Sequence, residues 1–251
     1  MSNTEPLIRN ISDTACWTAV YRAQENDRPD ALFRDPFARR LAGARGEQIA
    51  GLFPFGSRVT WTWVARTFLF DQFIAGQVDQ GADMVINLAA GLDARPYRMA
   101  LPASLEWIEV DRRGLFEQLG RRATKALIVT EGLLIYLTAD EVGSLAQDLA
   151  RPRSFDSWIV DLASPGLLRI LQQKMGSQLS QAGAGLKFGP EDGPGFFVPY
   201  GWQPTDVRGL LKTAARLKRL SLWMRLLALL PESTGRQGSR PWGGVCLLAK
   251  Q

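Results

Sequence analysis

One glycine and one aspartate are the residues of this sequence that most directly suggest chemistry. Gly91 follows a mostly apolar run from Met84 to Ala90, and a glycine there lets the backbone approach a ligand closely. Asp111 stands about twenty residues further on, after a second short run from Leu105 to Val110, where a carboxylate can bind both hydroxyls of a ribose. The pattern predicts a nucleoside-cofactor site, although an ordinary turn and a helix cap would use the same residue types.

The glycine turn favours one class of cofactor. A nicotinamide dinucleotide site needs GxGxxG at the start of a helix, because the glycines let the backbone reach the pyrophosphate. Here the turn continues from Asp93 to Arg98 without another glycine. S-adenosylmethionine has no pyrophosphate, and a single glycine with acidic neighbours suits its ammonium and sulfonium charges. We therefore expect S-adenosylmethionine, with a nicotinamide-dependent enzyme as an alternative.

Composition removes several other kinds of site. The chain has 251 residues and no histidine, which excludes Ser-His-Asp and Cys-His triads and the HExxH metal helix. Its two cysteines, Cys16 and Cys246, are too few for a four-cysteine zinc site or an iron–sulfur cluster. We expect no metal site, and catalysis must depend on the other polar side chains or on a positioned cofactor.

Short apolar runs in the second part of the sequence predict the elements that position these residues. The expected strands are 84–90, 105–110, 126–130 and a fourth around 158–160. Continuous apolar runs that end in glycine or an acidic residue are typical of parallel strands buried on both faces. Because ligands bind at the carboxyl ends of such strands, we expect a doubly wound, mostly parallel α/β sheet with its site at that edge.

The remaining segments are expected to cover and complete this sheet. Residues 1–80 predict a helical cap over the cofactor, including a helix from Val59 to Ala75 that Gly76 ends. Residues 81–251 predict the α/β core, and the whole chain is expected to form one compact domain. A helix after Pro204 and a final hairpin, with strands at 219–223 and 245–249, are expected near the carboxyl end.

Charge and hydropathy give weaker expectations. The net charge is +5 with a pI near 9.5, too mild to indicate nucleic-acid binding. The most apolar late stretch, Leu220 to Leu230, is broken by Arg225 and ends at Pro231, far short of the ~20 residues that span a bilayer. The amino terminus has no apolar signal core. We expect a soluble cytoplasmic protein that binds neither nucleic acid nor membrane; its oligomeric state is not predicted.

Longer strings resemble a known family. In order along the chain they are Tyr21-Arg-Ala-x-Glu25, Arg28-Pro-Asp-Ala-Leu-Phe-Arg-Asp-Pro36, Arg66 with Asp71, Asn87-Leu-Ala-Ala-Gly-Leu-Asp-Ala-Arg-Pro-Tyr-Arg98, Trp107-Ile-Glu-Val-Asp111 and Thr130-Glu-Gly-Leu-Leu-Ile-Tyr-Leu137. Together they resemble the leucine carboxyl methyltransferase family, in particular its bacterial branch of S-adenosylmethionine-dependent methyltransferases. The resemblance implies a Rossmann-like fold of the class I methyltransferase type.

The resemblance also implies roles for individual residues. Arg66 would meet the carboxylate of the cofactor, for which a guanidinium offers a fixed bidentate fork. Gly91 would lie beneath the methionine portion, Asp111 would bind the ribose, and Glu131 would face the cofactor. The weaker candidates for cofactor binding, from the cap and the glycine turn, are Arg22, Asn87 and Asp93.

Two departures from the family pattern bear on the site. Ala89 stands where the family often has glycine, which is acceptable if the backbone there keeps a negative φ. The family also carries several tens more residues after the aspartate, with a third strand and the pair that binds adenine, whereas this chain has only residues 112–125. Since a parallel crossover needs about a dozen residues, we expect a helix from Arg112 to Leu119, a missing third strand and a lost wall of the adenine site.

The resemblance implies an enzyme that O-methylates a carboxyl or hydroxyl group of a small molecule. A carboxylate acceptor needs no general base, which agrees with the lack of histidine. The loop from Gly183 to Gly195 and the aromatic residues that follow it would either cover the acceptor or belong to the core. Because of the shortened segment, a non-catalytic remnant of the fold, acting as a binding or scaffold protein, is the alternative function.

Overall fold

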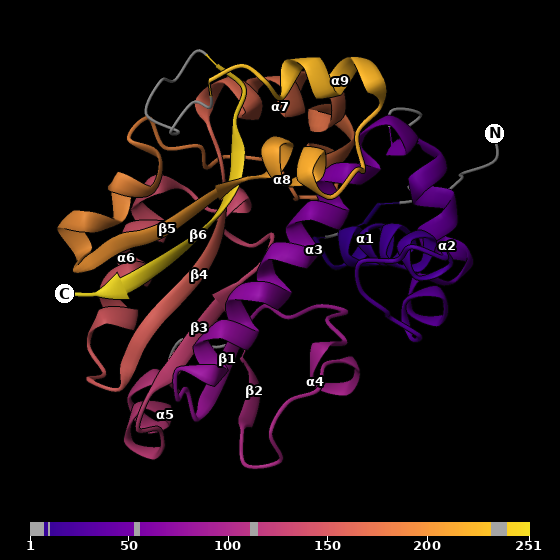
Figure 1. Ribbon diagram of the computed structural model, residues 1–251. Coiled ribbons are helices and arrows are strands. Elements are labelled where there is room, and N and C mark those ends of the chain that lie inside the picture. Colours follow the sequence, from indigo (N-terminus) through magenta and orange to yellow (C-terminus); the bar gives the residue numbers. More distant parts are fainter. Residues whose placement is uncertain (1–7, 10, 53–55, 111–114, 232–239) are drawn as a thin grey trace.

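A six-stranded sheet forms the centre of the protein (Figure 1). The computed structural model describes residues 8–9, 11–52, 56–110, 115–231 and 240–251. The strands, in chain order, are β1 (Met84–Leu88), β2 (Glu106–Val110), β3 (Ala126–Thr130), β4 (Phe155–Ala163), β5 (Trp202–Gly209) and β6 (Gly243–Lys250). Their spatial order is β2-β1-β3-β4-β6-β5.

The strand directions confirm the predicted fold class. β2, β1, β3 and β4 are mutually parallel, whereas β6 runs antiparallel between β4 and β5. β1 and β3 are buried along their whole length, as expected for parallel strands covered on both faces. β2 pairs with β1 alone, so within the described residues it is an edge strand. The additional strand that the family pattern places between the segments of β2 and β3 is not found among these residues.

Helices cover both faces of the sheet. The first face packs against α3 (Gly56–Asp79) and α8 (Leu210–Arg216), and Figure 1 shows α3 lying across the sheet. The second face packs against α5 (Phe116–Arg122), α6 (Ala139–Ala150) and the 3-10 helix η3 (Gly193–Tyr200). Alternate residues of β1 enter the two cores, because successive side chains of a strand point to opposite faces.

The remaining helices lie around this sandwich. α1 (Ile11–Asn26) and α2 (Ala38–Leu52) pack on each other and lie beside α3. The shorter or later elements are α4 (Arg95–Arg98), the 3-10 helix η2 (Leu134–Tyr136), α7 (Pro165–Gln181) and α9 (Leu222–Leu227). The division at residue 80 stays a prediction; α3, which precedes it, contributes a large part of the core on one face of the sheet.

Two predicted helix ends were wrong, because buried contacts outweigh the local cost of glycine. α3 continues beyond Gly76 to Asp79, and Gln77 in its last turn accepts a hydrogen bond of 2.8 Å from Ser157 of β4. An interior glycine costs about 1 kcal/mol, less than such packing supplies. α5 likewise continues through Gly120 to Arg122, and a Cβ at Gly120 would lie only 2.4 Å from Cβ of Pro152.

The predicted end of the chain was partly wrong. β6 confirms the strand expected at 245–249, but its hairpin partner is β5 and not residues 219–223. Pro204 lies inside β5, at a register shift on an edge strand, which is where a sheet tolerates proline. The aromatic residues after the glycine-rich loop belong to the core, since Phe197 and Trp202 are fully buried against Trp158.

Candidate active site at the carboxyl edge of the sheet

Arg66 of α3 pairs with two acidic residues, one directly after β3 and one near the end of β4. Its Nε lies 3.0 Å from Oε1 of Glu131, directly after β3, and its Nη1 donates to Oδ2 of Asp161 in β4 at 3.1 Å. The amide of Gly132 donates to the other oxygen of Asp161 at 2.7 Å. Residues far apart in the sequence therefore converge at the edge where the parallel strands end, which is where ligands bind in open α/β sheets.

Arg95 is a second centre of charge in the same place. Its side chain is 3% exposed and lies 2.7 Å from Asp71, 2.8 Å from Asp93 and 2.7 Å from Glu131. Burial by itself would lower the pKa of Arg95, but the three carboxylates raise it well above its ordinary value. Arg95 therefore stays charged, and its pairs hold the residues around Glu131 in a fixed arrangement.

The two acidic residues on Arg66 titrate differently. Burial acts to raise the pKa of Glu131, but Arg95, Arg66 and Arg22 outweigh it and lower that pKa to about 2. Glu131 is thus ionised at neutral pH. Burial raises the pKa of Asp161 against the opposing effect of Arg66. The site therefore keeps a fixed negative charge at Glu131, whereas the neighbouring carboxyl group of Asp161 gains a proton more readily than an ordinary aspartate.

The turn after β1 has two residues in the left-handed region. Gly91 has a φ of +58°, as a turn glycine can adopt without strain, but Ala89 has a φ of +52°. The condition under which alanine would be acceptable here, a negative φ, is therefore not met. The backbone must reverse there while the Ala89 amide pairs with the carbonyl of Val110 at 3.1 Å, and this conformation costs about 1–2 kcal/mol for a residue with a Cβ.

The amino-terminal helix is fastened directly to this turn. A Cβ on Gly91 would lie 3.3 Å from Cβ of Ala15 in α1, so the glycine also permits close approach of the helix. Arg22 of α1 donates to Asp35 at 2.9 Å and to the carbonyl of Leu92 at 2.7 Å. Arg22 therefore lies at the glycine turn and anchors the cap to it.

The other turn candidates make contacts within the protein. Asp93 accepts from the side chain of Asn87 and from the amide of Arg95, both at 2.9 Å, so both candidates help to hold the turn in shape. Arg98 makes two hydrogen bonds to Asp71. Asp111 lies outside the described residues.

Aromatic side chains line the site on the side of α1. The guanidinium of Arg66 lies 4.5 Å from the ring centre of Trp63, a cation–π geometry. Trp63 stacks on Tyr21 at 6.0 Å and meets Trp17 edge-on at 5.2 Å. Tyr136 of η2 donates to Thr14 of α1 at 3.4 Å, and burial raises its pKa. This wall keeps Arg66 away from water on one side.

The charges of the site fit S-adenosylmethionine. Within the described residues, its connected ion pairs join three guanidinium groups (Arg66, Arg95, Arg98) to four carboxylates (Asp71, Asp93, Glu131, Asp161), and Arg22 with Asp35 forms a separate pair beside them. An excess of carboxylate suits a cofactor with sulfonium and ammonium charges. Nε of Arg66 is buried and makes no hydrogen bond of good geometry despite its proximity to Glu131.

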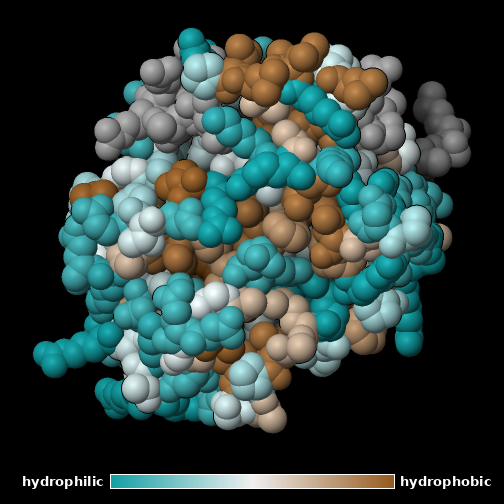
Figure 2. Space-filling view, in the orientation of Figure 1, coloured by the Kyte–Doolittle hydropathy of each residue, from teal (hydrophilic) through white to brown (hydrophobic). Residues whose placement is uncertain are grey.

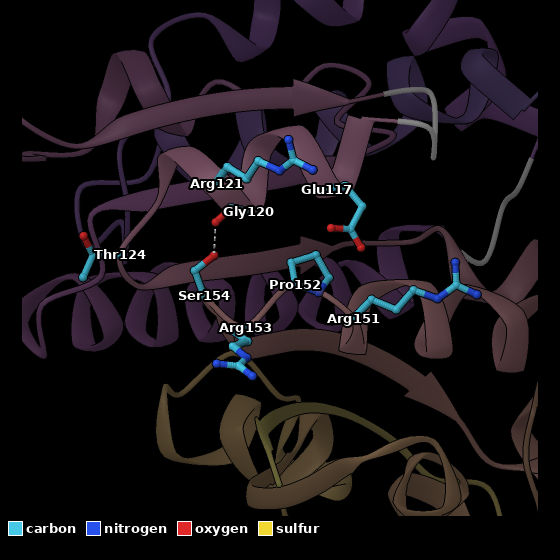
Figure 3. A pocket seen from close by; sticks show the side chains of 8 residues that line it. All are labelled: Glu117, Gly120, Arg121, Thr124, Arg151, Pro152, Arg153 and Ser154. Atoms are coloured by element: carbon cyan, nitrogen blue, oxygen red, sulfur yellow. Dashed lines mark hydrogen bonds between the residues drawn. The ribbon is translucent and has the colours of Figure 1, made fainter.

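A groove of about 470 Å³ lies at the opposite edge of the sheet, where β3 and β4 begin. Figure 3 shows that its arginines, Arg121, Arg151 and Arg153, point in different directions and do not converge on one position. Ser154 in its lining donates to the carbonyl of Gly120 at 2.6 Å. The convergent polar side chains are at the carboxyl edge, which is the better candidate site.

Sequence reasoning missed the partners that organise the site. Arg95 lies in the string around the glycine turn, but a buried arginine looks like any other in a sequence. Asp161 directly follows the fourth expected strand, around 158–160, and its contact with Arg66 joins residues 95 positions apart. A local signal for the role of Arg95 was its position two residues after Asp93, because an acidic and a basic residue at this spacing on a turn can form an ion pair.

Comparison with known proteins decides the family. The model of the family described as leucine carboxyl methyltransferase matches residues 15–118. A predicted S-adenosyl-L-methionine-dependent methyltransferase from Mycolicibacterium paratuberculosis is 30% identical over 212 residues, which cover 76% of this chain and 69% of that protein. The chain belongs to the leucine carboxyl methyltransferase family. The names of its relatives give S-adenosyl-L-methionine as their methyl donor.

Other comparisons agree with this family and fold. A predicted methyltransferase of the same kind from Rhodococcus jostii is 36% identical over 117 residues, which cover 44% of this chain and 40% of that protein. The chain thus spans less than half of this second family member. A crystal structure of a DUF574 family protein from Streptomyces avermitilis has a TM-score of 0.54 at 10% identity, covering 93% of this chain and 97% of that one. At that identity the likeness shows the fold alone.

Proposed function

We propose that this member of the leucine carboxyl methyltransferase family is an S-adenosylmethionine-dependent O-methyltransferase that acts on a carboxyl or hydroxyl group of a small molecule. The observation that carries the proposal is the convergence of Arg66, Glu131 and the Gly91 turn at the carboxyl edge of the sheet. These three come from separate segments, and their residue types match the charges of the cofactor.

Each residue has a distinct part in the proposed site. Arg66 would hold the cofactor's carboxylate through its fork of N–H donors, and the ionised Glu131 would face the positively charged part. Asp111 is proposed for the ribose hydroxyls, and Gly91 for close approach of the backbone. The cofactor supplies an activated methyl group, and the protein supplies alignment and exclusion of water.

The acidities at the site favour a carboxylate acceptor over a hydroxyl. A hydroxyl acceptor needs a group that removes its proton, whereas a carboxylate is already a nucleophile. The chain has no histidine, and burial raises the pKa of both Tyr21 and Tyr136, so neither phenol is an anionic base at neutral pH. The carboxyl group of Asp161 gains a proton more readily, but both of its oxygens already accept hydrogen bonds, from Arg66 and from the amide of Gly132.

The test is a methyl-transfer assay with radiolabelled S-adenosylmethionine and two panels of small molecules, carboxylic acids and phenols. Brief alkali releases volatile methanol from a methyl ester but not from a methyl ether, which separates the two classes. We expect alkali-labile product. Arg66→Ala should lower kcat/KM at least about 100-fold, as for loss of a charged contact of about 3 kcal/mol.

Arg121→Ala is the matched control, because Arg121 is an exposed arginine at the opposite edge of the sheet. It should leave kcat/KM within about twofold, as expected for an exposed surface substitution. Cofactor binding without transfer to either panel would contradict the proposed activity and favour the non-catalytic alternative.

A further inference from the structure

The late apolar stretch forms an exposed surface. Its large side chains stand in water: Leu222 is 79% exposed, Trp223 64%, Leu226 68%, Leu229 80% and Leu230 61%. Figure 2 shows hydrophobic side chains gathered at the upper edge of the molecule, over α9. A contiguous apolar patch on a protein surface usually marks a contact site. We call these five residues the α9 patch.

The helix is oriented with its apolar residues outward. Met224 and Ala228, four residues apart, pack against the core beside α3. Leu222 and Leu226 lie four residues apart on one face of α9, and Leu229 lies in the turn after it; all three are exposed. α9 and its C-cap therefore pack on the protein through Met224 and Ala228, and the larger apolar side chains of this segment face outward.

Charge around the patch points to an anionic partner. Residues 207–231 contain six basic residues and no acidic one. Two of the six, Arg208 and Arg219, are paired with acidic residues outside this segment. Of the others, Arg225 lies within the patch, and Lys218 lies just before it; both are exposed. A symmetric dimer through this face would bring the same basic side chains together, which disfavours a second copy of the chain as occupant.

We propose that the α9 patch docks this protein on an anionic lipid surface. Leucine and tryptophan side chains on a short basic segment are the composition of interfacial segments, which lie in the headgroup region without crossing the bilayer. Among the described residues no helix is long and apolar enough to span a membrane, which agrees with docking from one side. The proposal departs from our expectation that the protein binds no membrane, and it is independent of the proposed methyl transfer.

Flotation with lipid vesicles tests the proposal. The chain is mixed with vesicles of phosphatidylcholine alone or of phosphatidylcholine with phosphatidylglycerol. We expect flotation with the anionic vesicles. The double variant L226E/L229E should lose at least about tenfold in apparent affinity, because two apolar insertions are removed and two negative charges added.

Leu115→Glu is the matched control, since Leu115 is an exposed leucine elsewhere on the molecule, at 44% exposure. It should float like the parent chain, and all variants should keep the parent melting temperature within a few degrees. Absence of flotation with anionic vesicles, or an equal loss in Leu115→Glu, would overturn the proposal. Sedimentation gives a further contradicting result. If the parent chain forms a concentration-dependent dimer that L226E/L229E abolishes, and the parent chain does not float, the patch is an interface between copies.

Discussion

At the scale of single residues, a few side chains hold the candidate site together through contacts that span the sequence. Arg95 pairs with three carboxylates, and Arg66 lies between Glu131 and Asp161. Removing one member of such a network leaves another charge buried without compensation, which costs more than the pair contributes. The site residues are therefore structural as well as functional, and their substitutions need stability as a second readout.

Glu131 links the stability of the fold to pH. Its folded pKa of about 2 lies below the ordinary 4.5, so its ionised form stabilises the folded state. That contribution is fully present above the unfolded pKa and is lost as pH falls through the folded value. At about 1.4 kcal/mol per pKa unit, it amounts to about 3 kcal/mol.

Denaturant unfolding from neutral to acid pH measures this contribution. We expect the parent chain to lose stability more steeply than Glu131→Gln over the range between the two pKa values. The variant should be the less stable of the two at neutral pH. Parallel pH profiles would contradict the assignment.

Ala89 stores strain that a glycine would release. Its φ of +52° is unfavourable for alanine, so Ala89→Gly should raise the free energy of unfolding by about 0.5–1 kcal/mol, the release of strain exceeding the entropy cost of glycine. Ala75→Gly, the same exchange inside α3, should lower it by about 1 kcal/mol. Chemical denaturation of both variants checks the pair, and destabilisation by Ala89→Gly would show that the conformation is not strained.

At the scale of elements, two helical glycines should respond oppositely to alanine. A Cβ at Gly46 in α2 would lie 2.6 Å from the backbone oxygen of Cys16 in α1, whereas a Cβ at Gly76 in α3 would have no atom within 4 Å. Gly46→Ala should therefore lower the free energy of unfolding by about 1–3 kcal/mol through overpacking. Gly76→Ala should raise it by about 0.5–1 kcal/mol. Thermal melts of the two variants measure the contrast, and shifts of the same sign would refute this packing of α1 on α2.

The strands that the sequence predicted well are those buried on both faces of the sheet. β1 and β3 are buried on both faces, so their sequences are continuous apolar runs. The start of α6 also has a local sequence signal, because Thr138 and Glu141 have the residue types and spacing of a capping box. Both reciprocal hydrogen bonds of that box are present. β5 was missed because it alternates between buried and exposed residues and contains proline. α9 could not be placed, since its apolar side chains face outward.

At the scale of the whole molecule, the segment expected to be shortened concerns one edge of the sheet. The expected absence of a third strand agrees with the described topology, in which β2 is an edge strand and the other strands keep their order. That prediction combined the longer family pattern with the length of residues 112–125, because fourteen residues cannot hold two crossovers and a strand. The candidate site came chiefly from family strings, and its ion-pair partners are set by tertiary contacts that a single sequence does not encode locally.

The central claim is that the carboxyl edge binds S-adenosylmethionine despite the shortened segment. Calorimetric titration with S-adenosylhomocysteine, on protein whose intact mass is verified as 27.8 kDa, tests it most directly. We predict a Kd of the order of micromolar, or about −8 kcal/mol, weakened at least about tenfold by Arg66→Ala and unchanged by Arg121→Ala. A parent chain that gives no binding heat at that mass, while its thermal unfolding remains cooperative, would contradict the claim.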